Sequence, residues 1–268
     1  MSHAVHGHIA RKRFGQNFLA DTTVIERIVR AIAPQAGDRL VEIGPGLGAL
    51  THALLAHLPQ MIAIELDRDL AARLRVETLV EGKLQLIEGN ALKFDFRSLA
   101  ADQALRIVGN LPYNISTALI FHLLAQADII ADMHFMLQKE VVERMAAAPG
   151  DSAYGRLSVM VQVRCQVDPL FIVPASAFRP APKVESAIVR LRPYTLSPWP
   201  AHDPARLLSL VTQAFGQRRK TLRNALREHV DAKTLDSLGI DPGARPETLS
   251  VADYVRLAAH QEIHAPRP

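Results

Sequence analysis

The chain has 268 residues, 49% of them hydrophobic and 22% charged, which is a composition typical of globular domains. Its single cysteine, Cys165, excludes a disulfide framework and a multi-cysteine metal site, and it suits a reducing cytoplasm. The net charge is only +4, and no apolar run approaches the roughly 20 residues that a membrane-spanning helix needs.

Basic residues gather near the start of the chain. Arg11, Lys12 and Arg13 come before any acidic residue. Clustered basic side chains hold polyanions, because each neutralised phosphate releases condensed counterions. We expect these three residues to contact a polyanionic partner as part of a basic arm within residues 1–20.

Between residues 39 and 192, short apolar runs alternate with longer segments of helical pattern. The expected strands are 40–43, 61–65, 84–87, 106–108, 133–137, 158–164 and 186–191. The expected helices between them are 50–58, 69–80, 117–125 and 139–148. This alternation predicts a doubly wound, Rossmann-like α/β domain with a parallel sheet. The last two strands are expected to pair antiparallel at one edge.

The pattern of residue types changes after residue 192. Four prolines between residues 193 and 204 mark a linker, and the rest has only helical patterns, over 204–215, 220–229, 232–238 and 251–262. The sequence therefore predicts two domains. The first covers residues 1–195, and the second, residues 196–268, is small and all-helical.

The first expected strand runs into a glycine-rich turn, Gly44-Pro45-Gly46-Leu47-Gly48. Glycines at a strand-to-helix turn let the backbone approach a ligand that a Cβ would exclude. Glu65, 21 residues after Gly44, ends the second strand, where a carboxylate can accept hydrogen bonds from both hydroxyls of a ribose. This spacing suits any cofactor that contains adenosine, NAD included.

Two features of the turn favour an adenosine-containing cofactor other than NAD. Glu42 lies two residues before Gly44, and the turn lacks the G-x-G-x-x-G spacing that a dinucleotide pyrophosphate favours. The third strand leads to Asn90 and Ala91, in a loop that lies beside the ligand in doubly wound folds. The side chain of Asn90 is a candidate partner for the adenine amine of the cofactor.

The fourth strand ends in Gly109-Asn110-Leu111-Pro112-Tyr113-Asn114. These residue types suit a site that reacts with an amine on a purine ring. Such an amine is a poor nucleophile, because its lone pair is delocalised into the ring. Hydrogen-bond acceptors aimed at its two N–H bonds orient the amine and make the lone pair more available. The Asn110 side-chain carbonyl and a backbone carbonyl of Leu111 or Pro112 are the candidate acceptors, and Tyr113 offers a face on which an extruded base can stack.

A second basic cluster lies in the C-terminal region. Between residues 213 and 227 there is no acidic residue, but there are five basic ones, Arg218, Arg219, Lys220, Arg223 and Arg227. On a continuous helix, Arg219, Arg223 and Arg227 share one face. We expect this stripe to face phosphates, with a solvated helix face as the alternative.

Taken together, these stretches resemble the ribosomal RNA adenine dimethyltransferase family. The resemblance extends over nearly the whole chain, and the matching segments occur in the family's order. They are 13–19 (Arg-Phe-Gly-Gln-Asn-Phe-Leu), 109–116 (Gly-Asn-Leu-Pro-Tyr-Asn-Ile-Ser), 138–141, 154–158, 178–186 (Phe-Arg-Pro-Ala-Pro-Lys-Val-Glu-Ser) and 218–224.

The resemblance implies a fold, a cofactor and roles for individual residues. It implies S-adenosylmethionine as methyl donor, converted to S-adenosylhomocysteine, and a catalytic domain of the methyltransferase type. The residues implied at the cofactor are Asn17, Leu19, Gly44, Gly46, Glu65, Leu66, Asn90, Ala91 and Asn110. Asn110, Leu111, Pro112, Tyr113 and Phe178 would hold the target adenine, and the two basic clusters would bind RNA. The family usually has Asp at the position of Asn90, and losing this charge is expected to weaken cofactor binding.

Among relatives, the chain looks most like the bacterial small-subunit (16S) enzymes, which dimethylate two adjacent adenines near the 3′ end of the RNA. We therefore expect a cytoplasmic monomer that acts on small-subunit RNA within an assembling particle and contributes to ribosome biogenesis. Three alternatives stay open at this point. They are a large-subunit (23S) enzyme of the resistance type, an NAD-linked oxidoreductase, and a non-catalytic ribosome-assembly factor.

Overall fold

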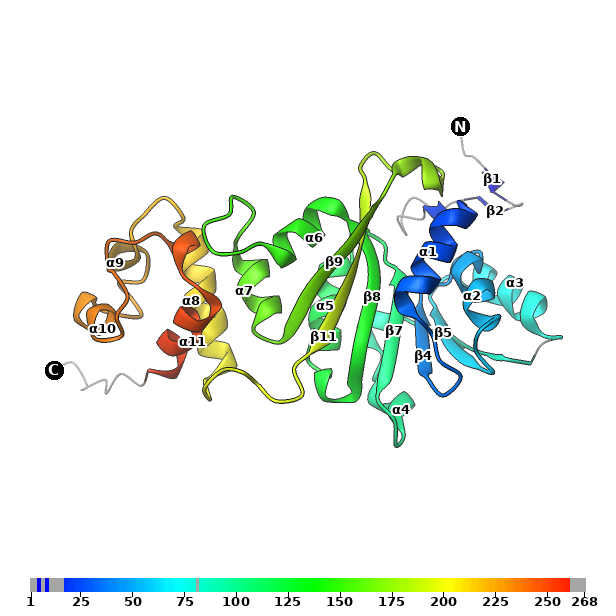
Figure 1. The fold of residues 1–268 in the computed structure, drawn as a ribbon, viewed down its shortest axis with the longest axis horizontal. Coiled ribbons are helices and arrows are strands. Elements are labelled where there is room, and N and C mark those ends of the chain that lie inside the picture. Colours follow the sequence, from blue (N-terminus) through cyan, green and yellow to red (C-terminus); the bar gives the residue numbers. More distant parts are fainter. Residues whose placement is uncertain (1–3, 6–7, 10–16, 81, 261–268) are drawn as a thin grey trace. The chain divides into compact units, whose positions relative to one another are not determined.

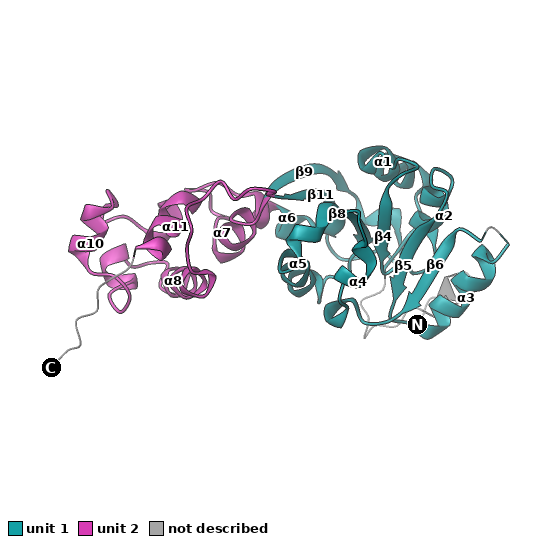
Figure 2. Ribbon diagram, turned by 90° about the horizontal axis from the view of Figure 1, so that it is seen from below, with its two compact units in different colours: residues 1–142, 166–193 teal, residues 143–165, 194–268 magenta. Residues whose placement is uncertain are grey.

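A computed structural model describes residues 4–5, 8–9, 17–80 and 82–260 of the protein. The chain divides into two compact units, each made of two stretches of sequence (Figure 2). The first unit contains residues 1–142 and 166–193, and the second contains residues 143–165 and 194–268. Each unit has its own cluster of buried apolar side chains.

A seven-stranded sheet forms the centre of the first unit (Figure 1). The strands are β4 (Arg39–Ile43), β5 (Met61–Glu65), β6 (Leu84–Glu88), β7 (Leu105–Asn110), β8 (Ile130–Gln138), β9 (Cys165–Val173) and β11 (Ser186–Pro193). They lie in the order β6-β5-β4-β7-β8-β11-β9. Neighbours from β6 to β8 are parallel, and β11 is antiparallel to β8. The predicted α/β fold with a mainly parallel sheet is therefore confirmed.

Helices cover both faces of this sheet, as a buried parallel sheet requires. Those of the first unit are α1 (Thr22–Ile32), α2 (Ala49–Leu55), α3 (Arg68–Thr78), α4 (Arg97–Ala100) and α5 (Ser116–Leu124). The helix α6 (Lys139–Ala146) begins in the first unit and ends in the second. Figure 2 shows α1 and α2 on one face and α4 and α5 on the other. The sequence analysis missed α1, whose first turn is capped by the Asp21 carboxylate and whose buried side chains recur at helical spacing.

The expected strand over residues 158–164 is wrong. Residues Arg156–Gln162 form the helix α7, and the edge strand β9 begins at Cys165. Ser158 caps this helix by accepting from the Gly155 amide at 3.0 Å, and Val159 and Val161 are completely buried. The alternation of apolar residues in this segment also suits a strand, so the pattern alone did not separate the two structures.

The second unit is helical. Its helices are α7, α8 (Pro204–Gly216), α9 (Leu222–Ala225), α10 (Ala232–Ser237) and α11 (Val251–Ala259). Their apolar side chains form one core that includes Tyr154, whose hydroxyl donates to the Leu249 carbonyl at 2.9 Å. The expected helix over 220–229 is reduced to α9, because the Leu222 amide donates to the Ala244 carbonyl. Arg219 therefore lies outside a helix, so the expected continuous helical stripe does not form.

The structure divides the chain differently from the expected boundary between residues 195 and 196. The C-terminal helices do not form a core by themselves, because α7 contributes Val159 to it and packs against α8 and α11. Residues 143–165 therefore belong with residues 194–268. No sequence pattern indicated that residues 143–165 belong to the helical unit, because they lie between two strands of the sheet in sequence.

Several short elements complete the description. The 3-10 helices of the described residues are η2 (Ala91–Lys93), η3 (Ala127–Ile129), η4 (Ala175–Ala177) and η5 (Pro246–Thr248). Strands β1 (Ala4–Val5) and β2 (His8–Ile9) pair with each other, and β3 (Phe18–Leu19) pairs antiparallel with β10 (Phe178–Arg179). Within the described ranges, no helix combines the length and the hydropathy needed to cross a membrane.

Candidate active site

The glycine turn after β4 forms the floor of a pocket at the carboxyl ends of the parallel strands. Gly44 and Gly46 have φ angles of +68° and +60°, which favour glycine. A Cβ on Gly46 would lie 3.3 Å from the Phe18 ring, and one on Gly48 would lie 2.7 Å from a Leu74 methyl group. Gly46 and Gly48 therefore have little room for a Cβ, and the turn borders a cavity of about 300 Å³.

Glu65 stands at the end of β5 with both carboxylate oxygens fixed. Oε2 accepts from the Gly46 amide at 3.1 Å, and Oε1 accepts from the Asp67 amide at 2.8 Å. Burial raises the pKa of Glu65, while these two hydrogen bonds act in the opposite direction. The carboxylate is thereby held in one orientation beside the glycine turn, with lone pairs left for the hydroxyls of a ribose.

The loop after β6 borders the same cavity. Asn90 Oδ1 accepts from the Leu92 amide at 3.0 Å and so caps η2. Ala91 is buried, whereas Leu66 is 48% exposed and lines the pocket from the end of β5. These residues lie at the edge of the pocket where an adenine ring can pack against apolar side chains.

The N-terminal segment reaches the pocket through β3. The pairing of β3 with β10 sets Leu19 opposite Phe178 and buries Leu19. Asn110 Nδ2 donates to the Asn17 carbonyl at 3.0 Å, so the end of β7 is tied to this segment. This bond fixes the orientation of the side-chain amide, whose Oδ1 is its acceptor in the pocket.

Residues 111–113 continue from β7 along the rim of the pocket. The Leu111 amide donates to the Met136 carbonyl, and the Pro112 carbonyl accepts from the Ile115 amide at 3.1 Å. The Tyr113 hydroxyl lies 2.7 Å from Ser186 Oγ. These bonds fix the backbone of the segment, and Tyr113 keeps a ring that lines the cavity.

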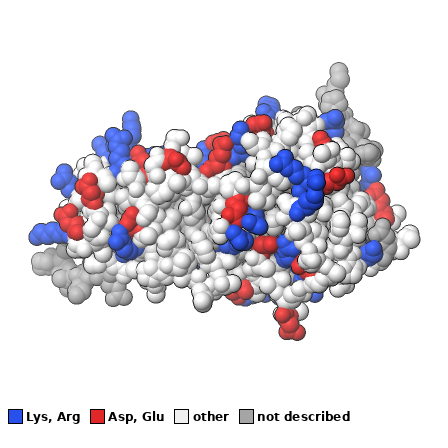
Figure 3. All heavy atoms as spheres, in the orientation of Figure 1, with Lys and Arg blue, Asp and Glu red and all other residues white. Residues whose placement is uncertain are grey.

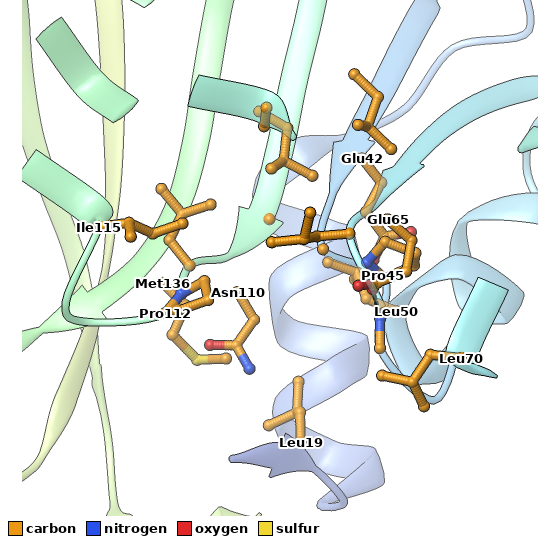
Figure 4. Close-up of a pocket in the computed structure, with 18 of the residues that line it drawn as sticks. Leu19, Glu42, Pro45, Leu50, Glu65, Leu70, Asn110, Pro112, Ile115 and Met136 are labelled. Atoms are coloured by element: carbon orange, nitrogen blue, oxygen red, sulfur yellow. Dashed lines mark hydrogen bonds between the residues drawn. The ribbon is translucent and has the colours of Figure 1, made fainter. Parts of the chain in front are cut away.

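One pocket therefore brings together most of the expected site residues. Figure 4 shows Asn110, Pro112 and Met136 on one side of it and Pro45, Leu50 and Glu65 on the other. The lining includes Asn17, Leu19, Gly44, Gly46, Glu65, Leu66, Asn90, Ala91, Asn110, Leu111, Pro112 and Tyr113. The structure places these residues in one cavity, and the role of each one in cofactor or adenine binding stays a prediction.

Comparison with known proteins gives the family. A family model described as ribosomal RNA adenine dimethylase matches residues 7–262. The chain belongs to the ribosomal RNA adenine dimethylase family. It is similar to the ribosomal RNA small subunit methyltransferase A of Marinobacter nauticus, at 60% identity over 94% of this chain and 92% of that protein. The protein of the same name from Escherichia coli is 54% identical over 99% of this chain and 98% of its own length.

Two solved structures resemble the chain over most of its length. A dimethyladenosine transferase from Plasmodium falciparum matches with a TM-score of 0.77 and 28% identity, over 90% of this chain and 95% of that one. The 23S rRNA methyltransferase ErmE matches with a TM-score of 0.71 and 27% identity, over 90% of this chain and 98% of that one. Both likenesses agree with the predicted family.

This ribosomal RNA adenine dimethylase is a methyltransferase, and its methyl donor is S-adenosylmethionine. The residues present suit that cofactor, because the glycine turn and the fixed Glu65 carboxylate line one cavity. When bound, S-adenosylmethionine supplies a methyl group on a positively charged sulfur. The NAD-linked oxidoreductase alternative is therefore not retained.

Phe178 is one expected site residue that the structure does not bring to the pocket of this dimethylase. Its side chain is only 1% exposed and packs in the apolar cluster that contains α1 and α2 residues. The pairing of β10 with β3 places it in this core. In this conformation it does not offer a ring face to a base, so the expectation that it stacks on the adenine is not supported by its position.

The expected RNA-binding residues of the dimethylase fall into two groups. Arg11, Lys12 and Arg13 lie outside the described residues. Arg218, Arg219, Lys220, Arg223 and Arg227 are all exposed on the second unit. Basic and acidic side chains are interspersed on the face drawn in Figure 3, so this face has no extended band of one charge.

Arg218 differs from the other four basic residues. Its guanidinium donates to the Ser152 carbonyl at 2.9 Å and lies 3.9 Å from a Glu247 carboxylate oxygen. It therefore links the loop before α7 to η5. This arrangement gives Arg218 a structural role that the sequence pattern did not separate from phosphate binding.

Two buried titratable residues line the dimethylase pocket in addition to the expected site residues. Glu42, in β4, accepts from the Thr51 hydroxyl at 2.7 Å, and burial raises its pKa to about 7. His134, in β8, is 3% exposed, and burial lowers its pKa to about 4. The glycine motif pointed to Glu42, but nothing in the sequence marked His134. Across the described part of the chain, no group of three His, Cys, Asp or Glu residues could hold a metal ion.

Proposed function

We propose that this enzyme dimethylates the N6 amines of two adjacent adenines near the 3′ end of small-subunit (16S) ribosomal RNA, using S-adenosylmethionine. The observation that carries this proposal is the position of Asn110. Its amide is held by the Asn17 carbonyl at the end of β7, in the cavity that also contains Glu65 and the glycine turn. An oriented acceptor beside a methyl-donor site is what an aromatic amine requires.

Two acceptors orient the amine. The first is Asn110 Oδ1, because the bond from Nδ2 to the Asn17 carbonyl fixes the orientation of the amide. The second is the Leu111 backbone carbonyl, because the Pro112 carbonyl already accepts from Ile115. Together they direct the nitrogen lone pair toward the methyl group and increase its availability.

Tyr113 supports the base by stacking. Its ring lines the cavity and its hydroxyl is tied to Ser186 on β11. Stacking of a base on an aromatic side chain is worth about 1–3 kcal/mol. An adenine flipped out of the RNA strand is thereby held in one plane beside the two acceptors.

We assign no general base to the reaction. The nitrogen becomes positively charged when the methyl group arrives, and its proton can then leave to water. His134 lines the pocket, but its lowered pKa makes it a weak proton acceptor. Catalysis therefore rests on proximity and alignment of the amine with the sulfonium methyl group.

The choice of small-subunit RNA rests on likeness to named relatives. Proteins called ribosomal RNA small subunit methyltransferase A are 54–60% identical to this chain, whereas the 23S methyltransferase ErmE is 27% identical. The large-subunit alternative is correspondingly weaker. The physiological substrate would be an assembling small subunit in the cytoplasm, bound by a monomeric enzyme through the basic residues of the second unit.

The test uses the full-length enzyme with labelled S-adenosylmethionine and either small-subunit particles or 23S RNA. We expect dimethyladenosine at two adjacent positions near the 3′ end of the small-subunit RNA, located by mass spectrometry of nuclease fragments. The Asn110→Ala variant serves as the control for catalysis. Methylation of only the 23S RNA would favour the resistance type, and no methylation of either RNA would favour a non-catalytic assembly factor.

A further inference from the structure

The cofactor cavity has an unusual balance of charge. Three carboxylates line it, from Glu42, Glu65 and Asp67. Among the described residues that line it there is no lysine or arginine. A cavity of this kind attracts a cation, and the strength of the attraction depends on how many of its carboxyl groups are ionised.

The three carboxylates differ in how they are stabilised. Glu65 accepts from two backbone amides, and Asp67 accepts from the Asp69 amide at the start of α3. Glu42 has one neutral partner in the structure, the Thr51 hydroxyl at 2.7 Å, and is only 2% exposed. Ionised Glu42 is therefore the least stabilised of the three, because a single hydroxyl replaces its water.

The surroundings of Glu42 favour its neutral form in the absence of ligand. Burial is the largest cause of its raised pKa of about 7, the Thr51 hydrogen bond acts against it, and the nearby Glu65 raises it further. The other titratable groups among the described lining residues are Asp67, His134 and Tyr113. Burial lowers the pKa of His134 and raises that of Tyr113, so both side chains are neutral at pH 7. Among the described lining residues, no lysine or arginine compensates a charge on Glu42.

The methyl donor and its product differ by one positive charge. The donor has a sulfonium centre, whereas the product has an uncharged thioether. We propose that Glu42 makes the cavity prefer the donor over the product, because its carboxyl group loses a proton when the donor binds and regains one when only the product remains. This inference rests on the cofactor of the enzyme and not on which RNA it methylates.

Over one catalytic cycle, Glu42 releases one proton and takes one back, and the amine proton leaves to water. Donor binding sends the Glu42 proton to solvent from Oε1, the oxygen that Thr51 does not contact. In the transfer, the sulfur–methyl bond breaks with its electron pair left on sulfur, the amine forms a bond to carbon, and the amine proton passes to water. Glu42 then takes a proton from solvent, so the product is left in a cavity with one fewer negative charge and dissociates more readily.

Calorimetric titration of the full-length enzyme tests this without RNA. We expect S-adenosylmethionine to bind about tenfold more tightly at pH 8 than at pH 6, whereas the affinity for S-adenosylhomocysteine changes much less. In buffers of different ionisation enthalpy, donor binding at pH 6.5 should release about 0.8 proton, since Glu42 with a pKa of about 7 is mostly protonated at that pH. Glu42→Gln should abolish the part of both effects that comes from Glu42, because glutamine does not titrate. Any contribution from the ammonium group of the ligand is the same in variant and wild type, so the difference between them isolates Glu42.

Thr51 provides a matched pair of variants. Thr51→Val removes the hydrogen bond that favours the ionised carboxylate, so the midpoint of the pH profile should move to higher pH, while Thr51→Ser should leave it in place. Equal pH dependence for donor and product, or unchanged proton release in Glu42→Gln, would overturn the proposal. If the donor bound at no pH, the cofactor assignment itself would fail, which is a different outcome.

Discussion

The hydroxyl of Tyr113 lies 2.7 Å from Ser186 Oγ, and this contact joins the loop after β7 to the first residue of β11. Ser186 is completely buried, and burial raises the pKa of Tyr113. The phenol therefore stays protonated at neutral pH and serves as an anchor for the ring. The stacking surface that we propose for the target base is positioned by a strand 73 residues further along the chain.

If the hydroxyl of Tyr113 only anchors the ring to Ser186, removing the hydroxyl should reduce methyl transfer less than removing the whole ring. Tyr113→Phe should retain most methyl transfer, with kcat/KM reduced by less than about tenfold, because one neutral hydrogen bond is worth about 1 kcal/mol. Tyr113→Ala should cost more, since it also removes the stacking face. Steady-state kinetics on small-subunit particles measures both. Near-total loss in Tyr113→Phe would give the hydroxyl a direct part in the reaction.

Asn110 should affect the rate far more than cofactor binding. Asn110→Ala removes the acceptor that orients the amine, so kcat should fall by orders of magnitude while the Kd for S-adenosylmethionine changes by less than about tenfold. Asn110→Asp keeps an acceptor but loses the donor to the Asn17 carbonyl, so an intermediate rate is expected. Rate measurements combined with calorimetry separate the two effects. Equal losses in rate and affinity would contradict the orienting role.

Asn90 is a position where a substitution should improve cofactor binding. Its Oδ1 accepts from the Leu92 amide, which leaves an NH₂ group as the other end of the side chain. An aspartate keeps the cap and adds a second acceptor for the adenine amine. Asn90→Asp should therefore lower the Kd of both S-adenosylmethionine and S-adenosylhomocysteine about two- to tenfold. Unchanged or weaker binding would show that Asn90 does not contact the adenine.

The raised pKa of Glu42 also has a consequence for stability. An acid whose pKa rises from 4.5 in the unfolded chain to about 7 in the folded one binds more protons when folded, so its contribution to stability falls as pH rises from about 4.5 to above 7. At pH 8 the cost is about 3 kcal/mol. Glu42→Gln should therefore stabilise the ligand-free protein at pH 8 and much less at pH 5. Urea unfolding at both pH values checks this, and a stabilisation independent of pH would argue against a buried, proton-binding Glu42.

The basic residues of the second unit should separate into two classes. Replacing Arg219, Arg223 and Arg227 together with Gln should weaken RNA binding and reduce its salt dependence, because each phosphate contact adds to the slope. Arg218→Gln should instead lower stability by up to about 1 kcal/mol, since it loses its contacts with Ser152 and Glu247. Filter binding over a salt series and urea unfolding distinguish the two. An unchanged slope in the triple variant would mean that these arginines only face solvent.

The strands of the sheet were accessible from sequence because burial on both faces produces continuous apolar runs. In β5 all five residues are buried, and the expected strand coincides with it. The site residues at strand ends followed from the same reasoning, since parallel strands bring their carboxyl ends to one edge. Asn90 follows β6 and Asn110 ends β7, and both line the pocket for this reason.

Other features depended on contacts that a linear pattern does not contain. The segment around Val159 has the alternation of a strand, but its packing against α8 and α11 makes it a helix. Phe178 resembles a residue that meets the target base, but its pairing with Leu19 buries it in the core. The unusual pKa of His134 arises from burial in the folded chain, so residue type alone gave no indication of it.

The core of the second unit includes side chains of α11, the last helix among the described residues. This core joins Val159 in α7 to Leu210 in α8 and Val255 in α11, yet two strands of the catalytic sheet, β9 and β11, lie between α7 and α8 in sequence. During synthesis, the apolar face of α7 therefore emerges long before the helices that cover it. A fragment starting at residue 194 would lack α7, so the helical unit cannot be transferred to another protein as one contiguous piece.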